Sequence, residues 1–177
     1  MAKNMTATEN GYSPGDWIVH DAHGIGQIIT IENKAIGSKE AVYYRIDTEN
    51  CTLWVPLDAE DVLRFLATPE EFAEATAVFK RPSRQMSTNY RSRLAHIRRA
   101  QDKGTPKALA RIVRDLWARQ QSRGKLSKTE NQALRDLFAQ LLTEWSVSME
   151  MEEKRTREQI YSLLQQNALP VPVSAQV

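Results

Sequence analysis

The spacing of apolar residues changes midway along this 177-residue chain, and this change most constrains the fold. Up to about residue 67, short runs of β-branched and aromatic residues alternate with turn-forming Gly, Pro, Ser and Asn. Beyond residue 68, apolar residues recur every three or four positions, which is the period of an amphipathic helix. We therefore predict an α+β protein in which a small β-barrel precedes an all-α helical domain.

The N-terminal half contains four runs typical of β-strands, at residues 16–20, 26–32, 41–47 and 51–56. Short strands separated by turn signals, with no helical pattern between them, favour a twisted barrel over a βαβ unit. We place this domain at residues 13–67, after a flexible tail at residues 1–12.

The C-terminal half carries clear helix start signals. A capping hydroxyl is followed by a proline at Thr68-Pro69 and again at Thr105-Pro106, and residues 127–130 form a capping box. A further helix is predicted at residues 87–101, after a break at 81–83.

The last helical pattern starts at the capping box and can extend past Glu150 to Leu164. We place the helical domain at residues 68–166 and a second flexible tail at residues 167–177, which contain two prolines.

The net charge of +2 conceals a very uneven distribution. Residues 13–67 contain four basic and nine acidic side chains, a net charge of −5, whereas residues 80–126 contain fourteen basic and two acidic ones, a net charge of +12. Such asymmetry predicts a polyanionic partner for the second half alone. A solvated basic surface without a partner is the alternative interpretation.

No motif predicts catalysis, a metal site or a cofactor. The segment His23-Gly-Ile-Gly26 lacks the third glycine and the following helix of a phosphate-binding loop, so a tight turn between strands is expected. His20 and His23 have no further ligands at metal-binding spacing. Cys51, the single cysteine, is expected to be a half-buried strand thiol. We predict that the protein is not an enzyme.

The chain contains no apolar run long enough to span a membrane, and Met1 to Gly11 lacks the apolar core of a signal peptide. With one cysteine there is no internal disulfide. These features predict a soluble, cytoplasmic protein.

Seven arginine and lysine side chains surround the break at residues 81–83 and the start of the helix that follows it. Free N–H groups at a helix start and nearby cations together favour phosphate binding. Bidentate base readers of a recognition helix are not evident, so we predict sequence-tolerant contacts with the backbone or the minor groove of DNA. The cations are Lys80, Arg81, Arg84, Arg91, Arg93, Arg98 and Arg99.

Two sets of motifs resemble a known family. The run GDWIVHDAHGIGQIITIE at residues 15–32, with Tyr43-Tyr44 and the LWVP of residues 53–56, resembles the polymerase-interacting domain of the CarD/CdnL family of bacterial transcription regulators. The same domain occurs in transcription-repair coupling factors. The run ARIVRDLWARQQSRGKLS at residues 110–127 resembles the helical DNA-binding domain of that family. The resemblance extends from about Ser13 to Trp145.

The resemblance implies a fold and a function. The N-terminal domain would be a Tudor/SH3-like barrel that adds its strand edge to the β subunit of RNA polymerase, in the N-terminal lobe region. The helical domain would lie at the upstream edge of the transcription bubble, where a tryptophan wedges into the minor groove of promoter DNA and stabilises the open complex. A nucleoid-associated monomer without a cofactor is implied.

For polymerase binding, the resemblance points to Lys34, Trp54, Val55 and Pro56. Lys34 stands where the family has an arginine, so the charge is kept but the bidentate fork is lost. Trp54 stands at a second such arginine, so a contact there would be apolar. The alternative role for Trp54 is packing within the barrel.

For DNA binding, the family's WSRRYK segment aligns with MSTNYR at residues 86–91, so Met86 stands at the wedge tryptophan. Met86 can be a weaker wedge, Tyr90 can take over the stacking, or the wedge can be absent. The alternative roles are a buried contact at the helix start for Met86 and core packing for Tyr90. The predicted DNA-binding residues are Arg84, Met86, Tyr90, Arg91, Arg93 and Arg98.

The sequence leaves alternatives open for the function and for residues 148–166. A polymerase-tethered interaction module without productive DNA contact is the alternative to a regulator that binds both partners. The segment at residues 148–166 is longer than expected for the compact form of the family, and it can pack back on the domain, extend as a free helix or contact a partner.

Overall fold

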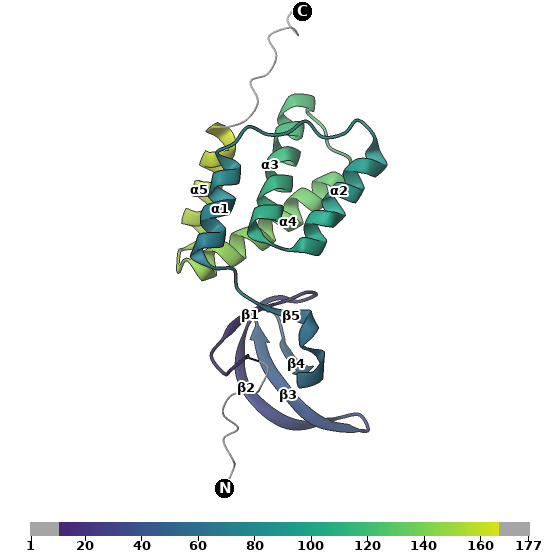
Figure 1. The fold of residues 1–177 in the computed structure, drawn as a ribbon, viewed down its shortest axis with the longest axis vertical. Helices are drawn as coiled ribbons and strands as arrows, with labels where there is room; N and C mark the ends of the chain where they lie inside the picture. The colour runs from purple at the N-terminus through teal and green to yellow at the C-terminus, as the bar shows by residue number, and fades with distance from the viewer. Residues whose placement is uncertain (1–10, 167–177) are drawn as a thin grey trace, which may run out of the picture. The chain divides into compact units, whose positions relative to one another are not determined.

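The computed structural model describes residues 11–166, apart from the side chains of Lys39 and Glu60. The chain divides into two compact units between Leu66 and Ala67, and each has its own hydrophobic core. Strands build the first unit and helices build the second (Figure 1). The predicted α+β class is therefore confirmed.

The first unit is one antiparallel sheet in the order β4-β3-β2-β1-β5. Within residues 11–66 no pairing joins β4 to β5, so the sheet is open and a closed barrel stays a prediction. The long β2–β3 hairpin is strongly curved (Figure 1). The elements are β1 (Trp17–His20), β2 (Gly24–Ile36), β3 (Lys39–Thr48), β4 (Thr52–Pro56), the 3-10 helix η1 (Leu57–Val62) and β5 (Leu63–Phe65).

The core of the sheet lies on one face. Ile18, Ile28, Tyr44 and Ile46 are fully buried there, because alternate residues of a strand point to the same side. Tyr12 was predicted to lie in a flexible tail, but it is buried in this core. Its hydroxyl donates to the carbonyl of Leu63 at 3.0 Å. Residues 1–10 and 167–177 of the two predicted tails lie outside the described residues.

Residues 67–166 of the second unit form five helices, and the predicted start signals at Thr68, Thr105 and Ser127 act as expected. Thr68, Thr105 and Ser127 each cap the helix that follows, and Thr68 and Ser127 both do so within complete capping boxes. The helices are α1 (Pro69–Phe79), α2 (Tyr90–Lys103), α3 (Pro106–Arg123), α4 (Lys128–Ser148) and α5 (Glu153–Gln166).

Two helix boundaries differ from the prediction. The helix expected from residue 87 begins at Tyr90, because the Asn89 side chain accepts from the Ser92 N–H at 3.1 Å and caps α2. The last helical pattern is divided in two at residues 149–152, where Glu150 has a left-handed φ of 49°. Because the chain turns there, α5 packs back against α4 and α1 and is not a free helix.

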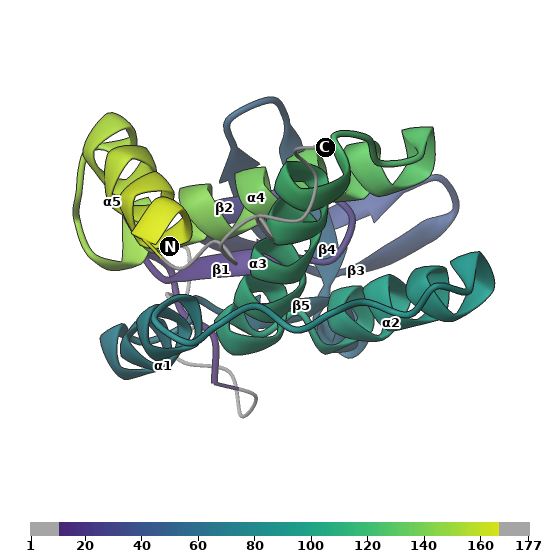
Figure 2. The ribbon, with the colours of Figure 1, turned by 90° about the horizontal axis from the view of Figure 1, so that it is seen from above.

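Helix α3 is central to the second core. Its buried face contacts α1, α2 and α4, and Figure 2 shows it crossing between them. Leu109, Val113 and Leu116 are fully buried. Phe72 of α1 stacks on Trp145 of α4, with ring centroids 5.1 Å apart. This contact joins the first and fourth helices of the unit. This core fixes the surface that carries most of the cations.

Candidate nucleic-acid interface

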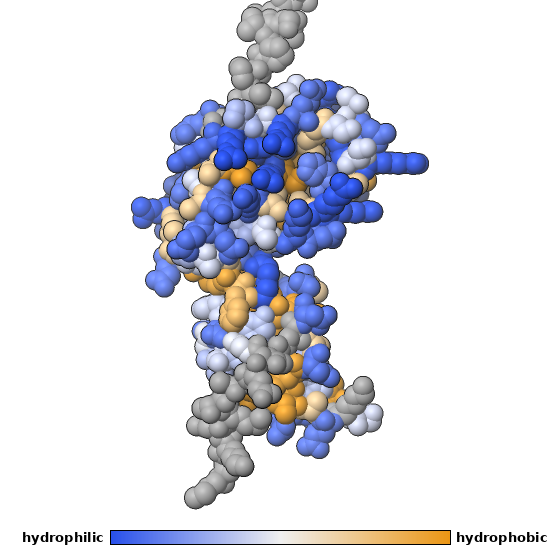
Figure 3. Space-filling model, viewed as in Figure 1, coloured by the Kyte–Doolittle hydropathy of each residue, from blue (hydrophilic) through white to orange (hydrophobic). Residues whose placement is uncertain are grey.

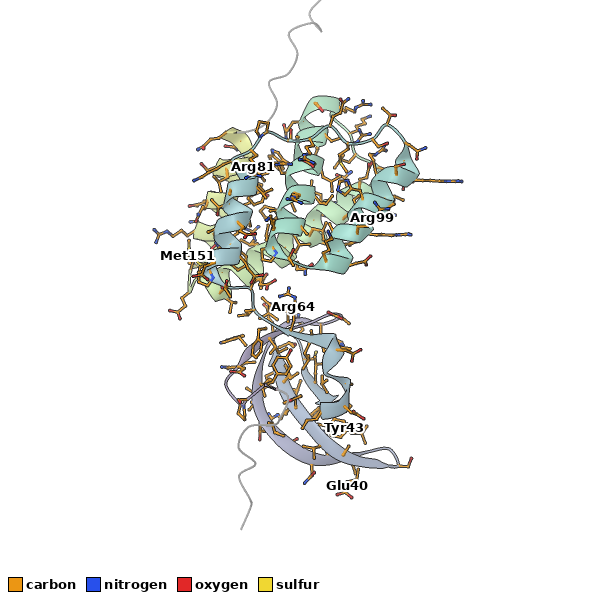
Figure 4. The ribbon with its side chains drawn as sticks, viewed as in Figure 1. Glu40, Tyr43, Arg64, Arg81, Arg99 and Met151 are labelled. Atoms are coloured by element: carbon orange, nitrogen blue, oxygen red, sulfur yellow. The ribbon has the colours of Figure 1, made fainter. Side chains whose placement is uncertain are left out.

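The segment at residues 80–89 joins α1 to α2 without regular secondary structure, and we call it the α1–α2 loop. Its cations Lys80, Arg81 and Arg84 are exposed, and Figure 4 labels Arg81 where the loop leaves α1. Hydrophilic side chains dominate the face that the helical unit presents in Figure 3. The loop is nevertheless fixed, because buried side chains of neighbouring helices bind its backbone.

The first attachment comes from α3. Arg114 and Asp115 are both buried, with Nη2 of Arg114 at 2.8 Å from Oδ1 of Asp115. Nη1 of Arg114 donates to the carbonyls of Val78 at 3.0 Å and Arg81 at 3.5 Å. Oδ1 of Asp115 accepts from the backbone N–H of Arg84 at 2.9 Å. The ion pair therefore holds the first half of the loop at the Arg81 carbonyl and the Arg84 N–H, and joins it to the last turn of α1 at the Val78 carbonyl.

The second attachment comes from α2 and α4. Nε of Arg93 donates to Oε1 of Glu130 at 2.5 Å, and both side chains are buried. Nη1 of Arg93 donates to the carbonyls of Ser87 at 3.0 Å and Thr88 at 2.8 Å. Glu130 also forms the capping box of α4 with Ser127. The end of the loop is therefore fixed to the start of α4.

The electrostatics of Glu130 agree with this arrangement. Burial alone raises the pKa of its carboxyl, but hydrogen bonds from Arg93 and Ser127 outweigh burial, so the pKa of Glu130 lies below its ordinary value. Arg119 of α3 adds a second cation, with Nε at 3.7 Å from Oε1 of Glu130. Glu130 is therefore an anion that caps α4 and pairs with arginines of α2 and α3.

Two of the predicted DNA-binding residues are not available at the surface. Met86 is only 8% exposed and belongs to the core of the helical unit. This burial agrees with the alternative role of Met86, a buried contact at the helix start. Arg93 is 7% exposed, and its guanidinium is engaged with Glu130 and two carbonyls. The wedge role of Met86 and the phosphate role of Arg93 stay predictions, but both side chains are buried in this conformation and would have to move to contact DNA.

The other four predicted residues are exposed. Arg84 lies in the α1–α2 loop, and Tyr90, Arg91 and Arg98 lie on α2. Tyr90 is 42% exposed, so the alternative of core packing is wrong for this residue. Arg91 and Arg98 are two turns apart and lie on one side of α2. We call these four side chains the basic surface.

The basic surface includes a helix start suited to anions. The first turn of α2, Tyr90 to Arg93, has no acidic residue, and α2 begins with free N–H groups and a partial positive charge. Tyr90 is the first residue of the helix, and Cζ of Arg93 lies 5.6 Å from the centroid of its ring. The arrangement can bind phosphates and stack on a base, without any group placed for covalent chemistry.

In the sheet unit, the predicted polymerase-binding residues gather on β2 and β4. Nζ of Lys34 lies 3.0 Å from the centroid of the Trp54 ring, and the indole N–H of Trp54 donates to Oε1 of Glu32 at 2.8 Å. Trp54 is half-buried outside the core of the sheet, on the face opposite Val55, which is buried in that core. The side chain of Val55 is therefore not accessible to a partner.

The backbone of β4 is a second binding element. Strand β4 pairs only with β3 among the described residues, so it is an open edge. The Thr48 N–H donates to the Cys51 carbonyl at 2.9 Å, and hydrogen-bonded pairs alternate along an antiparallel ladder. The backbone groups of Thr52 and Trp54 therefore point away from β3. Pro56, which has no N–H, ends this edge.

The other residues singled out in the sequence have simple roles. A tight turn between strands was predicted at residues 23–26; the turn lies at residues 21–23, and Gly24, with a φ of 74°, already begins β2. Cys51 is exposed at the β3–β4 turn, not half-buried in a strand, and its Sγ lies 3.4 Å from Oγ1 of Thr48. In the part of the chain that the structure describes, no three potential metal ligands cluster and no helix is long and apolar enough to cross a membrane.

Comparison with known families agrees with both units. Residues 12–67 match the CarD-like/TRCF RID domain, and residues 74–161 match the CarD C-terminal domain. The chain belongs to the CarD/CdnL family. Its two domains indicate a transcription regulator that interacts with RNA polymerase, and CarD-like families are transcription factors, not enzymes.

Membership of the CarD/CdnL family also corrects one expectation. The CarD C-terminal domain extends to residue 161, so most of α5 belongs to the domain and is no addition to it. The residues that sequence reasoning missed are Asp115 and Glu130. Their only sequence signals are the arginine that precedes Asp115 and the capping box that contains Glu130, and neither signal reveals a contact with the α1–α2 loop.

Proposed function

We propose that this CarD-family chain binds the β subunit of RNA polymerase through the β4 edge and promoter DNA through the basic surface, and thereby changes the lifetime of the open complex. The observation that carries the proposal is the exposed ring of Tyr90 at the acid-free start of α2, next to Arg91 in the helix and after the exposed Arg84 in the α1–α2 loop. Stacking and phosphate binding are the two contacts that such a group can make with DNA.

Polymerase binding is supported by the open edge of β4. A strand that exposes unpaired backbone groups can extend a partner's sheet, and the family resemblance indicates a strand of the β subunit. The Lys34–Trp54 pair beside this edge offers an aromatic ring with a cation above it and the carboxylate of Glu32 at its indole N–H. Lys34, Trp54 and Pro56 are therefore proposed to contact the partner by their side chains, and Val55 only by its backbone.

DNA binding is supported by charge and by position. The contacts would be with phosphates and the minor groove, since no side chain pattern predicts readout of a sequence. Because Met86 is buried, Tyr90 is the candidate for the stacking role. Such binding would be weak, tolerant of sequence and sensitive to salt.

A second candidate function is a polymerase-tethered module without productive DNA contact. It is favoured by the burial of Met86 and by the uncharged Thr88 and Asn89 at positions where the family has arginines. The two candidates predict different results for the same measurement.

The decisive test is the lifetime of promoter open complexes formed by the cognate polymerase, measured after a competitor challenge with and without the full chain. The regulator lengthens the lifetime, and Tyr90→Ala removes the effect while polymerase binding is kept. The tethered module binds polymerase and leaves the lifetime unchanged.

The β4 edge is tested separately by Thr52→Pro, with Thr52→Ala as the matched control. Both variants lose the Thr52 hydroxyl, which donates to Asp47 at 2.8 Å, but only proline removes the outward N–H. We expect pull-down of polymerase to fail for Thr52→Pro and to persist for Thr52→Ala. Equal binding by both variants would exclude strand addition at β4.

A further inference from the structure

The α1–α2 loop is irregular yet tightly held. Ser83 and Met86, in its middle, are both buried, although ten consecutive residues lie outside any helix or strand. Fixing such a segment costs conformational entropy, which only specific contacts can offset. The source of those contacts decides how the exposed Arg84 is presented.

Those contacts come mainly from two arginines that point inward. Arg114 binds one carbonyl in the last turn of α1 and one at the start of the loop, and Arg93 binds two carbonyls at the end of the loop. Arginine is suited to this role because its planar fork can serve carbonyls and a carboxylate at once. Asp115 adds the direct bond to the Arg84 N–H.

Each arginine is in turn oriented by one buried carboxylate. Asp115 accepts from Nε of Arg114 at 2.9 Å, and Glu130 accepts from Nε of Arg93. Without its carboxylate, either guanidinium would be a buried charge with too few partners and would turn toward water. The direction of the Nη1 atoms, and so the course of the loop, therefore depends on Asp115 and Glu130.

Stability alone does not explain these pairs. Buried ion pairs contribute little net stability compared with apolar residues of similar volume, because desolvation offsets the attraction. An apolar pair would fill the same space but could not bind four backbone carbonyls. The pairs are therefore better explained by the conformation that they impose on the loop.

We propose that Asp115 and Glu130 are positioning residues, which act through Arg114 and Arg93 to fix the α1–α2 loop in the conformation that exposes Arg84 at the surface. This inference rests on the proposed function, since it assigns the loop to the DNA-binding surface. It adds two residues that themselves face away from solvent.

The test uses Glu130→Gln in the full chain. Glutamine keeps the capping box of α4 but lacks the charge that holds Arg93. The matched control is Glu71→Gln, since Glu71 occupies the same position in the capping box of α1 but is exposed and holds no buried arginine. We call the Glu130–Arg93 pair, with its bonds to the loop carbonyls, the clamp. A change in a capping box should affect both variants, whereas loss of the clamp should affect only Glu130→Gln.

The first readout is hydrogen exchange of the loop without DNA. We expect peptides covering residues 80–89 to exchange at least about tenfold faster in Glu130→Gln and unchanged in Glu71→Gln. Unchanged protection in Glu130→Gln would overturn the inference whether or not the chain binds DNA. Asp115→Asn gives an independent check at the Arg84 N–H.

The second readout is affinity for a labelled 30-base-pair duplex. We expect Glu130→Gln to weaken binding about five- to tenfold in the parent chain, and less than twofold when Arg84→Gln is already present, because both changes remove the same contact. Equal effects in both backgrounds would mean that Glu130 acts elsewhere, and would overturn the inference. A parent chain that does not bind the duplex would refute the proposed function, while the exchange data would still decide whether the clamp exists.

Discussion

At the scale of single residues, Met86 and Tyr90 show how four positions can separate opposite environments. Met86 packs among core residues of the helical unit, whereas Tyr90 begins α2 with its ring partly in solvent. The cap at Asn89 lies between them and turns the chain from the buried loop to the exposed helix. The two residues are therefore expected to respond to substitution in different measurements.

Replacing Met86 should act on stability. We expect Met86→Ala to lower the free energy of unfolding by about 2–4 kcal/mol, because truncation of a buried side chain leaves a cavity. Met86→Leu, of similar volume, should cost less than about 1.5 kcal/mol. Urea unfolding of the full chain measures both. A stable Met86→Ala variant with weakened DNA binding would restore the wedge interpretation.

Replacing Tyr90 should act on binding. Tyr90→Ala is expected to weaken DNA binding by about 1–3 kcal/mol if a base stacks on the ring, with little change in the unfolding midpoint. Tyr90→Phe keeps the ring and serves as the control. Fluorescence anisotropy with a duplex that has an unpaired end measures the difference, and equal affinity of the alanine variant would rule out stacking.

At the scale of elements, two contacts decide how neighbouring segments fit together. In the sheet, Gly26 of β2 faces Ile46 and Thr48 of β3, and a Cβ at this position would lie 2.7 Å from Cγ2 of Ile46. In the helical unit, Glu130 joins the starts of α2 and α4 through Arg93. The first contact depends on the absence of a side chain, and the second on a charge.

Adding a methyl group at Gly26 should strain the β2–β3 pairing. We expect Gly26→Ala to destabilise the sheet unit by about 1–3 kcal/mol, because the neighbouring backbone and side chains must move apart. The control is Ala35→Val, which adds methyl groups at an exposed position of the same strand and should change stability by less than about 0.5 kcal/mol. Chemical denaturation followed by tryptophan fluorescence compares the two.

Acid should weaken the link between α2 and α4. Because the pKa of Glu130 is lowered in the folded state, the stabilisation by this group is present above its ordinary value near 4.5 and is lost as pH falls through the folded value. Arg93, Arg119 and Ser127 face the carboxylate. The urea midpoint should therefore fall less steeply on acidification in Glu130→Gln than in the parent chain. Parallel curves would contradict the pairing.

At the scale of the whole molecule, the charges are divided between two units with separate cores. The sheet unit is acidic overall, and the positive charge is concentrated in residues 80–126. A phosphate backbone therefore interacts favourably with the second unit only, and the first remains available for a protein partner. Salt should affect the two kinds of binding differently.

Removal of cations should show which face meets DNA. We expect the combined Arg84→Gln and Arg91→Gln change to reduce the slope of log affinity against log salt by about 1.8, at about 0.9 for each phosphate that is no longer neutralised. The combined Lys154→Gln and Arg155→Gln change removes the same charge from exposed positions on α5 and should leave the slope nearly unchanged. Equal slopes for both pairs would indicate a diffuse charge effect.

The sequence by itself determined the α+β class, the caps of α1, α3 and α4, and the family, because these follow from local signals. Thr68, Thr105 and Ser127 act on the backbone groups beside them, and alternation within a strand selects its buried face. The basic cluster that contains Arg84, Arg91 and Arg98 was also evident from charge alone.

Only the tertiary structure decided which members of the basic cluster are free to bind. Arg93 and Arg98 have the same charge and lie on one helix, but Arg93 faces Glu130, a residue 37 positions away, and is buried. Likewise Met86 belongs to the core of the helical unit, which no local pattern encodes. Long-range packing turns part of a charged sequence inward to hold a loop and leaves the rest at the surface.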